Sequence, residues 1–120
     1  VQKAVPGLYS DISSVEIDTY LAETAAALTV EHPDYSYLAA RIKVNSLHKE
    51  TPGFIIATKN LYDDGLLREE YFKKVMENAD AIESIIDYDK DYTFDYFALT
   101  TLIRAYLLKF DNQKRYYEDL

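Results

Sequence analysis

Apolar residues recur every three to four positions along most of the chain, which is the spacing of amphipathic helices. Residues 14–31 show the first such run, and Ser13 with Glu16 has the S-x-x-E spacing of a capping box. The apolar positions of this run are Ile17, Leu21, Ala25 and Leu28. The pattern predicts a helix over 14–31 whose N-cap is Ser13, with Ser14 as the competing cap.

A second run covers residues 35–50, between Pro33 and the Pro52-Gly53 pair. Proline and glycine at these places end helices, and Asp34 is of a type that caps one. One face of this predicted helix carries Tyr37, Ala40, Val44 and Leu47, and Leu38 with Ile42 widens it. We therefore expect this helix to be covered on more than one side.

The second half of the chain predicts shorter helices. A third helix covers about 54–62, and the run from Leu67 to Ile86 divides into two helices near Asn78. Residues 87–93 form an acidic loop, and the next helix covers 95–106, capped by Thr93 or Asp95. Its expected core side carries Phe97, Thr101, Leu102 and Ala105.

The end of the chain differs from the rest because it suggests strands. Residues 107–110 and 114–117 flank Asp111-Asn112-Gln113, which suits a hairpin turn. The predicted fold class is therefore mainly α, a bundle of about five to six helices with a short C-terminal β-hairpin as a candidate. Strand edges left without partners, and a first residue other than Met, suggest a piece of a longer protein.

The composition of the chain excludes several kinds of functional site. The chain has 120 residues, a formal net charge of −8 and no cysteine. Without cysteine there are no disulfides, thiolate metal ligands or thiol nucleophiles, which fits a cytoplasmic location. The negative charge disfavours nucleic acid and anionic membranes, and no apolar run approaches the ~20 residues of a membrane span. We expect neither as a partner.

Metal sites are not expected either. Asp87, Asp89 and Asp91 suggest a calcium loop, but Tyr92 and Ala98 occupy the positions where such a loop needs Gly and Glu. A solvated acidic loop explains them better. The two histidines, His32 and His48, lack a second histidine at helical spacing, so we expect structural roles for both.

The twelve tyrosines are unusual for this length. Tyr20, Tyr37, Tyr71 and Tyr106 fall at positions where the helical spacing predicts burial. Tyrosine combines a large apolar ring with a hydroxyl that can reach a partner. A tyrosine-rich core and packing surface is therefore the interpretation that we favour over a radical relay.

Six segments, taken together, are similar to a known family. They are 7–10 (GLYS), 14–18 (SVEID), 32–41 (HPDYSYLAAR), 47–51 (LHKET), 86–97 (IDYDKDYTFDYF) and 106–109 (YLLK). The first four resemble the second half of the ATP-cone of the class I ribonucleotide reductase large (alpha) subunit. The last two resemble the helical segment that follows it. The resemblance divides the chain into the C-terminal helical part of an ATP-cone (1–51) and part of the N-terminal helical domain (52–120).

The resemblance implies a function and three site residues. The family reduces ribonucleotides to deoxyribonucleotides, and its cone binds ATP as an activator or dATP as an inhibitor. Ser14 matches a hydroxyl beside the nucleotide, Asp18 matches the acid near the sugar, and Lys49 matches a base near the adenosine or phosphates. A helix N-terminus with a hydroxyl suits an anionic ligand, and residues four apart share a helix face. Capping and solvation alone would also explain Ser14 and Asp18.

The sequence also departs from the family. The basic V-x-K-R-x-G-type strand motif that grips the phosphates is missing, as are the cysteines of the radical reaction. We therefore expect no catalytic residue, no metal and no cofactor here, and weak or no ATP binding by the chain alone. Implied partners are the rest of the large subunit, the radical-generating small subunit and a homo-oligomer. The alternatives are an acidic helical adaptor or oligomerisation module, and a stand-alone nucleotide sensor.

Overall fold

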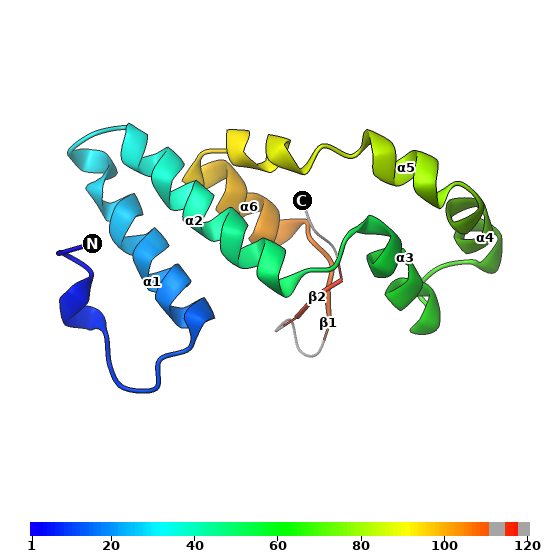
Figure 1. Ribbon diagram of the computed structural model, residues 1–120, viewed down its shortest axis with the longest axis horizontal. Coiled ribbons are helices and arrows are strands. Elements are labelled where there is room, and N and C mark those ends of the chain that lie inside the picture. The colour runs from blue at the N-terminus through cyan, green and yellow to red at the C-terminus, as the bar shows by residue number, and fades with distance from the viewer. Residues whose placement is uncertain (111–114, 118–120) are drawn as a thin grey trace.

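The computed structural model describes residues 1–110 and 115–117, and in this part of the chain it is mainly helical, as predicted (Figure 1). Its α-helices are α1 (Ser14–Ala27), α2 (Asp34–Glu50), α3 (Phe54–Asp63), α4 (Glu69–Glu77), α5 (Ala79–Ile85) and α6 (Tyr96–Ala105). Its 3-10 turns are η1 (Val5–Gly7), η2 (Leu28–Val30) and η3 (Tyr88–Thr93). The short strands β1 (Lys109–Phe110) and β2 (Arg115–Tyr116) pair antiparallel, and the predicted turn at 111–113 lies outside the described residues.

The helices α1 and α2 form an antiparallel pair in which each helix contributes buried alanines. Ser13 caps α1 as predicted: its Oγ accepts from the Glu16 N–H (3.2 Å), while Glu16 Oε2 accepts from the Ser13 N–H (2.9 Å). The buried alanines of the two helices are Ala22, Ala25, Ala39 and Ala40. Side chains this small let two helices approach closely, so the pair is tightly set.

The core lies where α6 crosses α2. Its buried members are Ala40, Val44, Leu47, Leu99 and Ile103. The prediction for α6 chose the wrong face, because Phe97 is 79% exposed while Leu99 and Ile103 are buried. Apolar residues surround α6 on most sides, so helical spacing alone does not identify the side that meets α2. Asp95, one of the two predicted caps, accepts from the Ala98 N–H at 2.8 Å.

The helices α3, α4 and α5 form a separate arm. The predicted division near Asn78 is confirmed, since α4 ends at Glu77 and α5 begins at Ala79. The arm is held by buried Ala57, Leu61 and Val75, and by the stacked rings of Tyr62 and Phe72, whose centroids are 4.1 Å apart. Gly65, with a φ of 75°, makes the predicted turn after α3.

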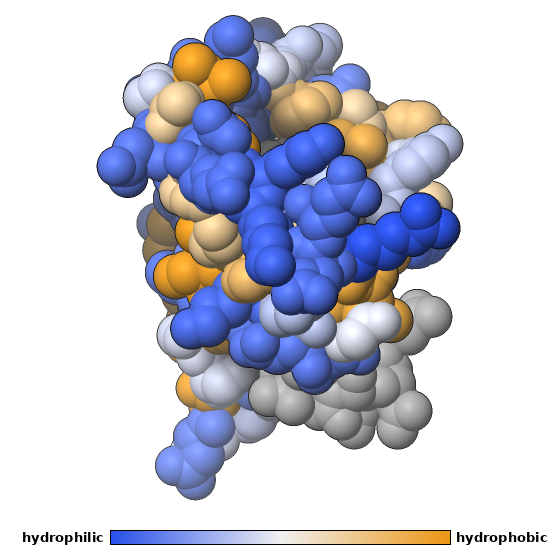
Figure 2. Space-filling view, turned by 90° about the vertical axis from the view of Figure 1, so that its right-hand side faces the viewer, coloured by the Kyte–Doolittle hydropathy of each residue, from blue (hydrophilic) through white to orange (hydrophobic). Residues whose placement is uncertain are grey.

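The molecule is elongated, with extents of 51 × 30 × 22 Å (Figure 1). Its radius of gyration is 16.8 Å, against about 14 Å for a compact chain of this length. The arm projects from the end of α2, and the surface at this end is largely hydrophilic with scattered apolar side chains (Figure 2).

Thr51 to Gly53 separate α2 from α3, yet η3 and α6 return to pack on α2. The division at residue 51 therefore stays a prediction.

Three further predictions were wrong. Tyr37, Tyr71 and Tyr106 are exposed at their helix surfaces, because the elongated shape leaves these faces without a neighbouring helix. Asp34 does not cap α2: its own N–H donates to His32 Nδ1 at 3.2 Å. The acidic loop at 87–93 is instead the 3-10 turn η3, in which Asp91 is buried.

Candidate functional site

Two of the three predicted site residues meet across the α1–α2 pair. Lys49 Nζ lies 2.9 Å from Asp18 Oδ2, although the two residues are 31 positions apart. The Asp18 side chain is 19% exposed and that of Lys49 is 57% exposed. The carboxylate is thus partly sheltered while the ammonium group still reaches solvent. Because the helices are antiparallel, the first turns of α1 face the last turn of α2, which brings the two charges together.

Ser14, the third predicted residue, is the first residue of α1 and is exposed. It does not cap the helix, because Ser13 does. Its hydroxyl is therefore not engaged in the capping box, and it lies one turn before Asp18 on the same side of α1. The structure places all three predicted residues at one end of the helix pair and directly joins only Asp18 and Lys49.

A second feature of this end is a bond network that sequence reasoning missed. The Tyr9 hydroxyl donates to Glu16 Oε1 at 3.0 Å. Hydrogen bonds from the Ser13 backbone and side chain and from Tyr9 hold the pKa of Glu16 below its usual value. The same carboxylate raises the pKa of Tyr9. The capping box identified Glu16, but no spacing in the sequence connects Tyr9 to it.

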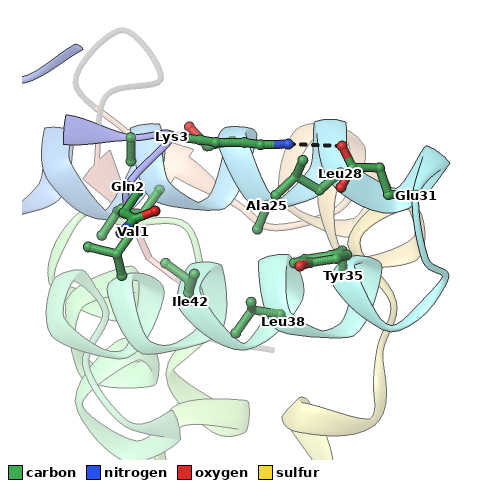
Figure 3. Close-up of a pocket in the computed structure, with 12 residues that line it drawn as sticks. Val1, Gln2, Lys3, Ala25, Leu28, Glu31, Tyr35, Leu38 and Ile42 are labelled. Atoms are coloured by element: carbon green, nitrogen blue, oxygen red, sulfur yellow. Dashed lines mark hydrogen bonds and ion pairs between the residues drawn. The ribbon is translucent and has the colours of Figure 1, made fainter. Parts of the chain in front are cut away.

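An apolar groove of about 510 Å³ extends along the α1–α2 pair (Figure 3). Its walls include Leu21 and Ala25 from α1, Leu28 from η2, and Leu38 and Ile42 from α2, and residues 1–4 lie along it. Leu21 is one turn along α1 from Asp18, and Ile42 is two turns from Lys49. The groove thus begins one to two helical turns from Asp18 and Lys49, which do not themselves line it. The predicted helical spacing of Leu21, Ala25 and Leu28 is what marks the wall formed by α1 and η2.

A second ion pair crosses the other end of this groove. Lys3 Nζ lies 2.9 Å from Glu31 Oε1, with both side chains mostly exposed (Figure 3). Nothing in the sequence singled out either residue. This pair resembles Asp18–Lys49 in length and in chemistry, but it lies away from the predicted site.

His48 has a partner that the sequence did not reveal. Its Nε2 lies 2.8 Å from Asp91 Oδ2 in η3. The predicted structural role for His48 agrees with this, while His32 lies exposed in the turn before α2, with its Nδ1 3.6 Å from Asp34 Oδ2. Within residues 1–110 and 115–117, no three side chains of His, Asp or Glu are grouped as a metal site needs. None of the described helices is long and apolar enough to cross a membrane.

Comparison with known proteins gives one consistent family. The large chain of ribonucleoside-diphosphate reductase from Schizosaccharomyces pombe is 38% identical over 122 residues, which covers 93% of this chain and 15% of that protein. The Danio rerio large subunit is 41% identical, covering 92% and 15%. The Variola virus large subunit is 36% identical, covering 92% and 16%. No family model matches the chain.

These similarities decide between the two main interpretations of the sequence. The chain spans about 15% of the length of the relatives that it matches, while they cover nearly all of it. These relatives from a fungus, an animal and a virus are all reductase large subunits, and none of the three is an adaptor or an oligomerisation module. The chain therefore belongs, over nearly its whole length, to the family of ribonucleoside-diphosphate reductase large subunits.

Proposed function

We propose that this chain is a regulatory segment of a ribonucleotide reductase that converts ribonucleotides to deoxyribonucleotides for DNA synthesis. In this proposal the segment carries part of an ATP/dATP site that sets overall activity. The chain has no cysteine, so the thiyl-radical chemistry of the reaction takes place in other parts of the protein. Its partners are the rest of the large subunit, the small radical-generating subunit and further copies of the large subunit, in the cytoplasm.

The observation that carries the proposal is the Asp18–Lys49 pair. The residues were chosen from separate sequence segments, and the fold brings their charged groups to 2.9 Å. A partly sheltered carboxylate can accept hydrogen bonds from the hydroxyls of a ribose, which ATP and dATP carry in different number. An exposed ammonium group beside it can neutralise phosphate charge. The exposed hydroxyl of Ser14 lies at the start of α1. This place suits an anion, because the backbone N–H groups at a helix N-terminus point out of the helix toward a ligand bound there.

The groove supports the same assignment. Its walls are mainly aliphatic, and two of its wall residues, Leu21 and Ile42, lie one and two turns from Asp18 and Lys49. Nucleotide bases bind in apolar surroundings while their sugar and phosphates need polar groups at one end. An apolar groove with a charged pair one to two turns away therefore suits one nucleoside phosphate.

The test is a binding measurement on the full-length protein. Asp18→Asn and Lys49→Met are expected to weaken ATP binding about 10-fold or more, because each removes a hydrogen bond to a charged group. Asp18→Asn should also reduce the difference between ATP and dATP, since the carboxylate faces the sugar. Isothermal titration calorimetry with both nucleotides measures these constants.

The chain supplies a matched control. Glu69→Gln and Lys73→Met remove an ion pair of similar length, 3.1 Å, on α4 and outside the groove, and they should leave ATP affinity within about twofold. Equal losses in the control variants would contradict the assignment. The 120-residue chain alone is expected to bind ATP weakly or not at all, because it lacks a basic V-x-K-R-x-G-type motif. Micromolar binding by the chain alone would contradict that expectation.

A further inference from the structure

The last turn of α2 carries two neighbouring polar side chains that bind different elements. Lys49 reaches Asp18 on α1, and His48 reaches Asp91 in η3. Neighbouring residues leave a helix about 100° apart, so one turn of α2 serves both contacts. A displacement of this turn toward or away from α1 therefore changes the position of the His48 ring relative to η3.

The His48–Asp91 contact is the more enclosed of the two. The side chains are 25% and 10% exposed, against 57% and 19% for Lys49 and Asp18. Tyr88 and Tyr92 place their rings edge-on to the imidazole, with centroids 6.3 and 5.9 Å away. Partial burial strengthens a polar contact and narrows its geometry, so the imidazole has little freedom to move independently of η3.

The turn η3 also connects to the α3–α5 arm. The Tyr88 hydroxyl donates to Glu83 Oε2 of α5 at 3.2 Å. The other oxygen of the same carboxylate, Oε1, accepts from the Ile55 N–H of α3 at 3.4 Å. On the other side, the Tyr92 hydroxyl donates to Asn45 Oδ1 of α2 at 2.6 Å. A continuous set of polar contacts thus runs from α2 through η3 to two helices of the arm.

We propose that His48 is a positioning residue that couples the Asp18–Lys49 pair to the α3–α5 arm through η3. This proposal rests on the proposed function in one respect, because nucleotide binding is the event that starts the coupling. A nucleotide that binds Asp18 or Lys49 competes with the ion pair between these two residues. Release of Lys49 changes the forces on the last turn of α2, and the enclosed His48–Asp91 contact passes the change to η3. The coupling itself needs only that the ion pair can be broken.

Hydrogen exchange in the full-length protein tests the coupling. Addition of ATP should change amide exchange over 83–93 and 54–63, with a response of about 5-fold or more, as for typical coupled sites. His48→Ala should remove this response while leaving ATP affinity within about twofold, because His48 does not touch the predicted nucleotide residues. His48→Gln, whose amide nitrogen can donate to Asp91, should restore part of it. A full response in His48→Ala overturns the proposal.

The second histidine supplies the matched control. His32 lies exposed near Asp34 at the other end of α2. His32→Gln should leave the response over 83–93 unchanged, and a loss equal to that of His48→Ala would overturn the specific role of His48.

A measurement without nucleotide separates this proposal from the proposed function. Lys49→Met breaks the ion pair directly, and it should change exchange over 88–93 when His48 is present but not in the Lys49→Met/His48→Ala double variant. If the protein does not bind ATP, the proposed function fails, and this comparison still decides the coupling. The coupling proposal is overturned if Lys49→Met changes amide exchange over 88–93 equally with and without His48, or if it changes this exchange in neither background.

Discussion

The α1–α2–α6 bundle and the α3–α5 arm are built from the same kind of helix but are held together differently. The bundle contains side chains with no exposure at all, including Val44 and Leu99, packed with Leu47 and Ile103. The arm has no fully buried large side chain among its described residues, and it depends on Leu61, Val75 and one surface ring stack. The comparison indicates that the bundle is the rigid element and the arm the more adjustable one.

This difference in packing suits the roles proposed for the bundle and the arm. Effector residues need fixed geometry, and the Asp18–Lys49 pair joins α1 and α2, the two helices with the most extensive mutual contact. A segment that passes a signal onward needs elements that shift at low free-energy cost, and such elements have few buried apolar contacts. The polar contacts through η3 join the two regions where apolar packing is sparse.

The largest expected effect compares one substitution in the two regions. Leu99→Ala in the bundle is expected to lower the free energy of unfolding by about 3 kcal/mol, because it leaves a cavity in a packed core. Leu61→Ala in the arm should cost less, about 2 kcal/mol, because its neighbours near the surface can close around the gap. Urea unfolding measures both. A cost for Leu61→Ala equal to that of Leu99→Ala would remove the distinction between the regions.

A smaller effect concerns the ring stack of the arm. Phe72→Leu keeps an apolar side chain but removes the stack on Tyr62, whose ring lies 4.1 Å away and nearly parallel. The expected loss is about 1 kcal/mol, the usual contribution of an aromatic pair beyond its buried area. Phe97→Leu is the matched control, since Phe97 is largely exposed and no aromatic pair with it is found among the described residues. Equal losses in thermal unfolding would show that the stack contributes nothing specific.

The contrast between regions also explains what could be predicted from sequence. Helix boundaries depend on local signals, so the Ser13–Glu16 capping box, the break at Asn78 and the cap at Asp95 were all confirmed. Buried faces depend on which helices meet. Tyr37 and Phe97 have core-like spacing, but no described helix covers them.

The site shows the same limit. Resemblance to the family selected Asp18 and Lys49, and the fold brings them together. The partners Asp91 of His48 and Tyr9 of Glu16 lie 43 and 7 residues away in sequence, with no periodicity that links them. Such contacts depend on how η3 folds back on α2 and on how the N-terminal segment approaches α1. Local pattern therefore predicts the helices, while polar partners across elements require the tertiary structure.

The smallest expected effect is a pH dependence confined to the bundle. Bonds from Ser13 and Tyr9 lower the pKa of Glu16 from its usual value of 4.5. The folded state therefore favours the ionised carboxylate, and its contribution is fully present above about pH 4.5 and is lost as the pH falls through the lower folded pKa. Amide exchange at the start of α1 should accelerate over that range, measured relative to α4, whose N-cap Arg68 makes no side-chain cap bond.

Glu16→Gln separates this charge effect from capping itself. Glutamine can still accept from the Ser13 N–H, so the capping box remains while the titration disappears. The variant should therefore show slightly faster exchange at neutral pH and no change specific to α1 below pH 4.5. Glu69→Gln in the first turn of α4 is the matched control, because Glu69 pairs with Lys73 and not with an N-cap residue. If the wild-type α1 and α4 respond identically to acid, the cap network of Tyr9, Ser13 and Glu16 does not distinguish the bundle from the arm.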